Sequence, residues 1–418
     1  MPAETTVHVL DPADSVGIAL RDIRAGETVL TGTGQEITAA AEVPGGHKVA
    51  LRRLKVGDAV IKYGHRIGVA TVGIATGDHV HLHNLAFSDH EKPTAGMAGS
   101  APAHTVELPE RRSFLGIKRA DGSVATRNHI AIVSTVNCSV ARMVAAHAEQ
   151  ELRERHPGID GVIAVTHDSG CAAVSDGQGM RILRRTLAGY ATHPNVGGVV
   201  IIGLGCEINL IATLLEHTHF TRQVPVEKFD IQDAGGTRAA IGKGLEAVRR
   251  MAPEVAEVTR EQVPVSGLIV GLNCGGSDGW SGVTANPALG YASDLITAQG
   301  GSTVLAETPE VYGAEDLLVR RATSPRVARK LLDQLAWWEA YVAADGGTMN
   351  NNPSPGNNAG GITTILEKAL GAVAKSGHSP MTAVLDYAEK ITTPGFSFMD
   401  TPGYDPVSVT GLVAGGAN

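Results

Sequence analysis

Three apolar runs that alternate with helical stretches constrain the fold of this chain more than any other feature of its sequence. The runs are HIAIVSTV (residues 129–136), GVIAVTH (161–167) and VGGVVIIGLG (196–205). Such runs are typical of strands buried on both faces, and their alternation with helices favours a parallel sheet covered by helices. The pattern resumes near Val263 with SGLIVGLNC and STVLAE. The sequence therefore predicts an α/β protein with two α/β segments, residues 114–262 and 263–418, whose sheets are mostly parallel.

The first part of the chain has a different texture. In residues 1–90, the short apolar segments VHVL, ETVL, DAVIKYG and VGIA lie between Gly, Asp and Pro turns, which predicts a small antiparallel β domain. Residues 91–113 are rich in Pro, Ala, Gly and charge. This composition predicts an exposed linker between the β domain and the first α/β segment.

Composition excludes several classes of partner. The 418 residues carry a formal net charge of −8, which argues against nucleic acid, because phosphate binding needs a basic face. The first residues lack the basic and apolar regions of a signal peptide, and no stretch reaches the roughly 20 apolar residues that span a bilayer. We therefore expect a cytoplasmic protein with no membrane partner, whose four cysteines are reduced thiols and not a disulfide scaffold.

All four cysteines follow predicted strands. They are Cys138 (STVNC), Cys171 (THDSGC), Cys206 (IIGLGCE) and Cys274 (LNCGG). The carboxyl edge of an open α/β sheet is where ligands bind, whereas purely structural cysteines fall more often inside strands or on helix faces. Two interpretations stay open: the thiolates gather around a metal ion or cluster, or they line a reduced pocket.

Histidines mark two further candidate positions. GDHVHLHN places His79, His81 and His83 at alternating residues, so that in a strand all three imidazoles share one face and neighbours can chelate a divalent metal. The alternative is a solvated edge strand with no ligand. THDSGC places His167 and Asp168 at a strand end, where a histidine can act as a general base or metal ligand because its pKa lies near neutrality.

A glycine-rich loop, NPSPGNNAGGITTILEKALG (352–371), precedes a predicted helix. Its prolines stiffen the loop, and Gly360 and Gly361 let the backbone approach a ligand. Thr364 and Glu367 match a capping box at the helix start. We expect free N–H groups at this start to suit a substrate carboxylate, with Lys368 as an added positive charge.

Sequence motifs for nucleotides are incomplete. GLGCEIN has Gly203 and Gly205 of a dinucleotide fingerprint, but Ile208 occupies the third glycine position. The chain also contains neither a P-loop nor a GxSxG nucleophile motif. We therefore expect no nucleotide cofactor.

Taken in order, the motifs resemble those of the altronate and galactarate dehydratases, a family of sugar-acid dehydratases. The stretches that carry the resemblance are RADGSVATRN (119–128), STVNC, THDSGC, IIGLGCE, CGGSDGWSGVTANPALGYASD, NPSPGNNAGGITTILEKALG and DTPG (400–403). GHKVAL, VIKYG and GDHVHLHN resemble the SAF (β-clip) domain with which these enzymes begin. The resemblance covers essentially the whole chain. Members of the family usually continue past the GGAN that ends this sequence, so we expect a shortened chain.

The resemblance implies loss of water from a 2,3-dihydroxy acid to give a 2-keto-3-deoxy acid. The histidine row favours a D-altronate-like aldonate as the small-molecule partner. The implied cofactor is a divalent metal, Fe(II) with Mn(II) as the alternative, which stabilises the enediolate that forms when the α-proton is removed. We also expect a homodimer.

Within this chemistry His167 is the candidate base, and His81 or His83 is the candidate acid or a metal ligand. Asp278 is a candidate for the catalytic groups and the metal shell, to which the resemblance adds His79 and the four cysteines. Candidate donors to the substrate are Gly275, Gly276, Asn357, Gly360 and Gly361. Three alternatives remain: a galactarate-type aldarate dehydratase, a sulfo-lyase of the same architecture, and a non-catalytic sugar-acid binding protein.

Overall fold

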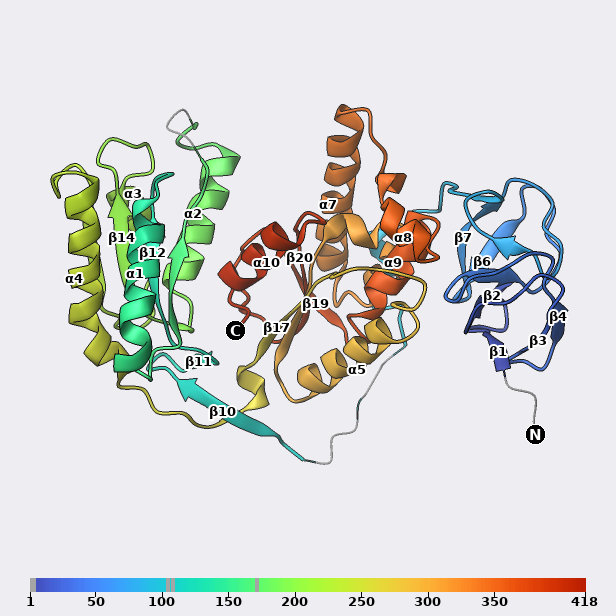
Figure 1. Ribbon diagram of the computed structural model, residues 1–418, viewed down its shortest axis with the longest axis horizontal. Coiled ribbons are helices and arrows are strands. Elements are labelled where there is room, and N and C mark those ends of the chain that lie inside the picture. Colours follow the sequence, from blue (N-terminus) through green and yellow to red (C-terminus); the bar gives the residue numbers. More distant parts are fainter. Residues whose placement is uncertain (1–4, 103–105, 107–109, 170–172) are drawn as a thin grey trace.

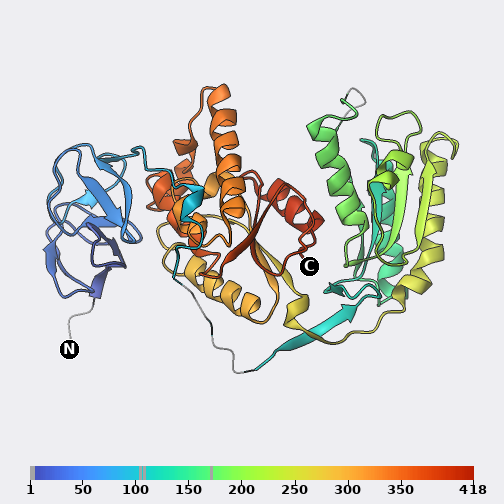
Figure 2. The same cartoon turned by 180° about the vertical axis from the view of Figure 1, so that it is seen from behind.

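The protein consists of three domains in a row in the computed structural model, which describes residues 5–102, 106, 110–169 and 173–418 (Figure 1). The C-terminal domain (residues 265–418) lies in the centre. The N-terminal domain (5–88) lies on one flank and the second domain (113–264) on the other, and the view from behind gives the same order (Figure 2). The order in space therefore differs from the order in sequence, and both flanking domains face the C-terminal domain.

The N-terminal domain is built from short strands joined by turns. Its strands are β1 (Thr5–His8), β2 (Val16–Ala19), β3 (Thr28–Thr31), β4 (Glu36–Thr38), β5 (Lys48–Ala50), β6 (Ala59–Lys62), β7 (His65–Ala70), β8 (His79–Val80) and β9 (Leu85–Ala86). One sheet has the order β4-β3-β1-β2-β5-β8 and the other the order β6-β7-β9. Strands β1 and β3 pair in parallel and the other pairs are antiparallel, so the predicted antiparallel β domain is confirmed except at that pair.

The second domain is a parallel sheet covered on both faces by helices, as the apolar runs predict. Its elements are β10 (Ser113–Lys118), β11 (Val124–Ala125), β12 (His129–Ser134), α1 (Val140–Arg155), β13 (Gly161–Val165), α2 (Gln178–Ala191), β14 (Val196–Gly203), α3 (Ile211–Glu216), β15 (Val226–Asp230), α4 (Thr237–Ala256) and β16 (Glu261–Pro264). The parallel sheet has the order β13-β12-β14-β15. Helices α1 and α4 cover one face of the sheet and share one apolar core with it. Helices α2 and α3 cover the other face and share a second apolar core with it. Strand β10 enters the domain antiparallel to β16, which leaves it.

The C-terminal domain has a second parallel sheet, in the order β17-β18-β20-β19. Its elements are η2 (Val265–Gly267), β17 (Ile269–Leu272), α5 (Ala285–Ala298), β18 (Ser302–Leu305), η3 (Thr308–Val311), α6 (Glu315–Val319), α7 (Pro325–Ala344), η4 (Met349–Asn351), α8 (Pro355–Ala359), α9 (Ile365–Ala374), β19 (Met381–Leu385), β20 (Gly395–Met399) and α10 (Asp405–Ala414). Every residue from Ile365 to Val373 is buried, so α9 lies inside the protein. The expected mixed α/β fold with mostly parallel sheets is confirmed.

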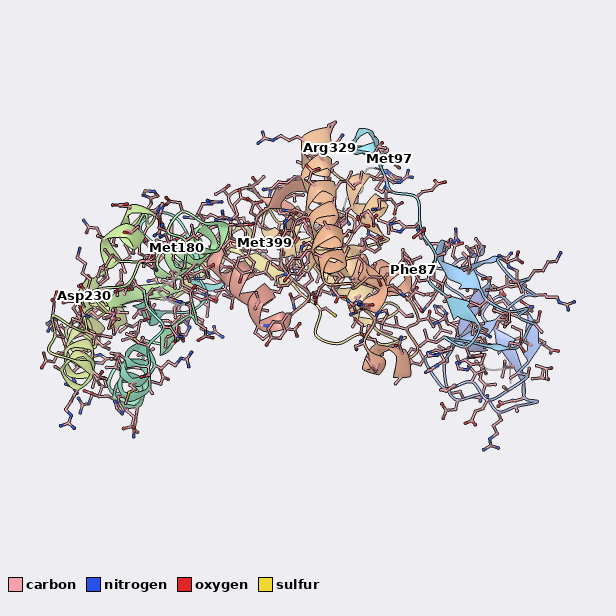
Figure 3. All side chains as sticks on the ribbon, turned by 90° about the horizontal axis from the view of Figure 1, so that it is seen from above. Phe87, Met97, Met180, Asp230, Arg329 and Met399 are labelled. Carbon is pink, nitrogen blue, oxygen red and sulfur yellow. The ribbon has the colours of Figure 1, made fainter. Side chains whose placement is uncertain are left out.

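One apolar core crosses from the N-terminal domain into the C-terminal domain. Val60 and Ile67 of the N-terminal domain belong to the same buried cluster as Ile365 and Ala369 of α9. Phe87 packs against this cluster, and Figure 3 shows it at the junction of the two domains. The cores of the second domain contain no residue of another domain among those described.

Residues 92–97, which follow the N-terminal domain, pack on α7 of the C-terminal domain. Within this segment, η1 (Ala95–Met97) contacts α7, and Figure 3 shows Met97 close to Arg329 of that helix. Lys92 forms an ion pair of 2.5 Å with Glu339, also on α7. No helix within the described ranges is long and apolar enough to cross a membrane.

Candidate functional site

The parallel strands of the C-terminal domain end at one edge of the sheet, and polar residues follow them. Cys274 comes shortly after β17, Glu307 after β18 and Asp400 directly after β20. The Cys274 N–H donates to the Glu307 carboxylate, and the Glu307 N–H donates to the Thr401 hydroxyl over 2.8 Å. Hydrogen bonds therefore join three strand ends into a single edge, which is where open α/β sheets bind ligands.

Glu307 is the most perturbed group at this edge. Its side chain is buried, with 2% of the residue exposed, and its backbone has a left-handed φ of 71°. Burial raises the pKa of Glu307 to about 7, although the bond from the Cys274 N–H acts in the opposite direction. A non-glycine residue in the left-handed region of backbone conformation costs about 1–3 kcal/mol of free energy. Such strain and shifted pKa values are both typical of functional sites. The sequence analysis missed Glu307, although the strand STVLAE carries it at its carboxyl end.

A closed triangle of polar side chains lies beside Glu307. The Lys368 ammonium donates to the carboxylate of Glu310 over 3.0 Å and to the side-chain oxygen of Asn352 over 2.6 Å. Asn352 in turn donates to Glu310 over 2.7 Å. Lys368 therefore brings a positive charge to this region, as predicted, but its ammonium is already paired, and Glu310 and Asn352 were not predicted.

A cluster of histidines, here called the histidine flank, lies where the N-terminal domain meets α8. Strand β8 ends at Val80, so the expectation of one strand that carries all three predicted histidines is wrong. The rings nevertheless gather: the His79 centroid lies 5.5 Å from those of His81 and His83. His47 was missed by the sequence analysis and joins them, with its Nδ1 3.1 Å from His79 Nε2.

Burial keeps three histidines of the flank, His47, His79 and His81, neutral. It lowers the pKa of His79 to about 4 and also lowers those of His47 and His81. Neutral imidazole is the form that binds metals. The sequence signal for His47 was its place in GHKVAL, one of the stretches that carry the family resemblance.

Both glycine-rich loops meet beside the histidine flank. The Asn357 amide donates to the Ser277 carbonyl over 2.8 Å, and the Gly279 N–H donates to the Gly360 carbonyl over 2.6 Å. Because Cβ of Asp278 would lie 2.8 Å from a Cβ at Gly360, only glycine fits at that position. The structure thus brings together the two loops that the sequence singled out.

The helix start after these glycines does not offer the donors that we expected. The N–H groups of Gly360 and Gly361 donate to the carbonyls of Gly356 and Asn358. At the start of α9, the Ile365 N–H donates to Asn350. The expectation of free N–H groups there is therefore wrong, because α9 is buried and a buried N–H must find a partner inside the protein.

The capping box is half present. The Thr364 hydroxyl accepts from the Glu367 N–H over 3.3 Å, as predicted. The Glu367 carboxylate does not complete the box, because it accepts from the N–H and hydroxyl of Thr363 and from two lysines of the N-terminal domain.

The turn after Cys274 is open. A Cβ added to Gly275 or Gly276 would meet no atom within 4 Å. One oxygen of Asp278 accepts from the N–H groups of Trp280 and Ser281, each over 2.9 Å, so this carboxylate stabilises the turn. The substrate-binding role of Gly275 and Gly276 and the catalytic role of Asp278 stay predictions.

A large cleft separates the second domain from the C-terminal domain. It has a volume of about 1350 Å³, and its lining includes His167, Arg185, Trp337 and Thr401. Burial lowers the pKa of His167, and the Ser169 N–H donates to its Nδ1 over 3.1 Å. His167 therefore lies at a strand end in a cavity, whereas the histidine flank contacts α8, on the side of the C-terminal domain that faces the N-terminal domain (Figure 1). The structure does not bring these predicted acid and base groups together.

The described cysteines follow strands as predicted, but they do not converge. Cys138 and Cys206 follow strands of the second-domain sheet, and Cys274 follows a strand of the other sheet. Their sulfurs contact Ser134, Gln232 and Ser277 respectively. Cys171 lies outside the described residues. Among the residues that the structure describes, no three His, Cys, Asp or Glu side chains are arranged to hold a metal ion, so the expected cysteine site is not formed by these three.

Models of three domain families match the chain in order. "Altronate/galactarate dehydratase SAF domain" matches residues 5–88, "D-galactarate dehydratase/Altronate hydrolase, second domain" matches 116–256, and "D-galactarate/Altronate dehydratase, C-terminal" matches 265–418. The chain belongs to the altronate/galactarate dehydratase family. The resemblance seen in the sequence is thus confirmed, and the N-terminal domain is the family's SAF domain.

Relatives within this family align with nearly the whole chain. The altronate dehydratase of Bacillus subtilis is 36% identical over 405 residues, which are 96% of this chain and 80% of the relative. The altronate dehydratase of Escherichia coli is 36% identical over 422 residues, 99% of this chain and 81% of the relative. The L-threo-forming galactarate dehydratase of Escherichia coli is 34% identical over 415 residues, 96% of this chain and 78% of the relative. Members with these names are hydro-lyases, and this chain is an enzyme of that class.

Each domain of this dehydratase family contributes a different part of the candidate site. The SAF domain supplies the histidine flank, the C-terminal domain supplies the sheet edge with Glu307, and the second domain supplies the cleft with His167. The histidine flank contacts the loop that leads into α9, whereas the cleft with His167 is lined by Thr401 of the sheet edge.

Proposed function

We propose that the chain removes water from a monocarboxylic sugar acid, such as D-altronate, to give a 2-keto-3-deoxy acid. The reaction takes place at the carboxyl edge of the C-terminal sheet. Relatives named altronate and galactarate dehydratase support sugar-acid dehydration in general. The observation that carries the proposal is Glu307, a buried carboxyl group at a strand end whose pKa is raised to about 7 by burial. Such a group is protonated often enough at neutral pH to act as a general acid.

Dehydration needs a base for the α-proton and an acid for the departing hydroxyl group. His167 is neutral because burial lowers its pKa, so it can accept the α-proton. Glu307 gives its proton to the 3-hydroxyl group, which leaves as water, and the resulting enol tautomerises to the ketone. Thr401 lines the cleft with His167, and its hydroxyl accepts from the Glu307 N–H, so these two groups lie around a common residue.

Lys368 and Asn352 serve to bind and orient the sugar acid. Their polar atoms form a closed triangle with Glu310, which fixes the ammonium beside the sheet edge. A fixed positive charge favours an anionic substrate and stabilises the negative charge that develops as the α-proton leaves.

We further propose that His47 and His79 hold the divalent metal, Fe(II) with Mn(II) as the alternative. The 3.1 Å between His47 Nδ1 and His79 Nε2 equals about the separation of two adjacent nitrogen ligands that each lie about 2.1 Å from one ion. His47 Nε2 faces the Ala359 carbonyl over 3.1 Å, the kind of outer hydrogen bond that ligating histidines make. When bound, the metal would supply a Lewis acid at the histidine flank.

The test is an assay of the anaerobically purified protein on altronate, galactarate and sulfolactate, combined with metal analysis. We expect keto-acid formation from altronate and iron in the protein. In the Glu307→Gln variant we expect kcat to fall about 100-fold with little change in KM, because the proton donor acts only in the chemical step. His167→Ala should also lower kcat, because it removes the proposed base, and His217→Ala, which changes an exposed histidine of the second domain, is its control.

The other outcomes separate the alternatives. Faster turnover of galactarate would favour an aldarate dehydratase, and release of sulfite from sulfolactate would favour a sulfo-lyase. Thermal stabilisation by a sugar acid without turnover would favour a binding protein. Full activity of Glu307→Gln would contradict the proposed role of Glu307.

A further inference from the structure

Two lysines of the SAF domain and one glutamate of α9 form a buried charge triad. The Lys48 ammonium lies 2.9 Å from the Glu367 carboxylate, and the Lys62 ammonium lies 2.7 Å from it. The three side chains are exposed by 2% or less. The triad therefore joins β5 and β6 to α9 across the domain boundary.

The triad contains two positive charges and one negative charge. A buried ion costs free energy of desolvation, and the second ammonium adds to this cost. One ammonium would balance the charge of the Glu367 carboxylate, so the role of the other lies in its further contacts.

Only Lys48 also contacts the loop that leads into α9. Its ammonium donates to the Gly361 carbonyl over 2.6 Å. Gly361 has a left-handed φ of 100°, and a Cβ there would lie 2.7 Å from the Gly46 carbonyl oxygen, so the loop is pressed against the SAF domain. Among the contacts of the described residues, the Lys62 ammonium reaches the carboxylate of Glu367 and the Tyr63 side chain, but not this loop.

The Gly361 contact is the last of a row. Four consecutive carbonyls of this loop accept hydrogen bonds from outside it, from His81, His47, the Gly279 N–H and Lys48 in that order. Three of the four donors belong to the SAF domain. Such a row fixes the loop, and the loop determines where α9 begins.

We propose that Lys48 is a positioning residue for the dehydration. It holds the Gly361 carbonyl and thereby fixes the start of α9, whose Lys368 reaches Glu310 and Asn352 at the proposed site. Lys62 balances the charge of Glu367 and, within the described part of the chain, makes no hydrogen bond to Gly361. This inference rests on the proposed function, since Lys368 acts on the substrate only in that reaction.

Lys48→Met and Lys62→Met form a matched pair of variants. Each removes one buried ammonium and leaves Glu367 with one partner, but only Lys48→Met also removes the bond to Gly361. We expect the two variants to unfold at similar temperatures. We expect kcat on altronate to fall roughly 100-fold in Lys48→Met, as for a group displaced by about 1 Å, and to stay within about threefold of the wild type in Lys62→Met. KM should change less than kcat in both.

Hydrogen–deuterium exchange of residues 357–362 gives a readout that does not depend on turnover. We expect faster exchange in Lys48→Met and wild-type exchange in Lys62→Met. Equal loss of kcat in the two variants, or no loss in either, would overturn the proposal. If the wild type turns over no sugar acid, the proposed function fails, whereas the difference in exchange still decides whether Lys48 positions the loop. If a Met variant does not fold, Lys48→Gln and Lys62→Gln repeat the comparison.

Discussion

The SAF domain and the second domain are joined to the C-terminal domain in different ways. The SAF domain shares an apolar core with the C-terminal domain and places two buried lysines on Glu367 of α9. The second domain keeps its own cores and meets the C-terminal domain across a cleft of about 1350 Å³. Its contacts with that domain include packing of α2 on α10 and hydrogen bonds from Arg185, His193 and Asn195 to the main-chain oxygens of Tyr387, Ala417 and Asn418.

The two boundaries therefore have different roles. A fused core keeps the histidine flank and the Gly361 loop in one arrangement, as a pre-organised site needs. An open cleft gives the substrate access to the sheet edge, and β10 and β16 connect the second domain by a pair of strands. Four tests, ordered by expected effect, probe this comparison.

Glu367→Gln should cause the largest loss of stability, because it leaves two buried ammonium groups without their counter-charge. Removal of one partner from a buried ion pair costs about 3–5 kcal/mol. Urea unfolding at pH 7 measures the change in the free energy of unfolding.

The control is Glu151→Gln on the second domain. Glu151 pairs with Arg249 over 2.8 Å at the surface, where water screens the charges, so its loss should change stability little. Similar losses in the two variants would contradict the view that the SAF boundary is held by buried charge.

Gly361→Ala and Gly189→Ala each place a methyl group against a backbone carbonyl, the first at the SAF boundary and the second at the cleft boundary. At Gly361 the new Cβ would lie 2.7 Å from the Gly46 carbonyl oxygen, and at Gly189 it would lie 2.2 Å from that of Ala414. We expect Gly361→Ala to cost about 2–4 kcal/mol, because its left-handed backbone adds strain and the fused domains cannot separate.

We expect Gly189→Ala to cost less than Gly361→Ala, although its Cβ would approach the backbone more closely. Alanine is favoured in a helix by about 0.5–1 kcal/mol over glycine, and the second domain can shift to relieve the contact. Thermal unfolding of both variants measures this contrast, and a larger loss in Gly189→Ala would reverse the assignment of the rigid boundary.

The same contrast explains what the sequence predicts and what it does not. The strands, helices and positions of the cysteines at strand ends were predicted, because apolar periodicity and glycines are local signals. Glu367 matched a local capping box, but its carboxylate pairs with Lys48, 319 residues away. His47 joins His79 across 32 residues. Such partners depend on how domains pack, and a single sequence does not carry this information.

Glu307, at the sheet edge between the two boundaries, should make the stability of the protein depend on pH. Burial raises its pKa from an ordinary value of 4.5 to about 7. A carboxyl group with a raised folded pKa stabilises the fold fully below pH 4.5, and this contribution is lost as the pH rises through 7. At 1.36 kcal/mol per pKa unit the wild type should lose about 3 kcal/mol relative to Glu307→Gln between pH 4.5 and 8.

Urea unfolding of both proteins at the two pH values measures this difference. Glu42→Gln, at an exposed carboxylate of the SAF domain, is the control and should follow the wild type at both pH values. If Glu307→Gln also follows the wild type, the carboxyl group of Glu307 is ionised at neutral pH and does not act as the acid.

Arg185→Ala should have the smallest effect on stability and the largest effect on the arrangement of domains. It removes the hydrogen bond to the Tyr387 carbonyl, and such a bond contributes about 1 kcal/mol. Small-angle scattering should show a broader distribution of distances between domains, because less then holds α2 against α10. A loss comparable to that of Glu367→Gln would mean that the cleft boundary is as firmly fixed as the SAF boundary. In that case access to the sheet edge would not depend on movement of the second domain.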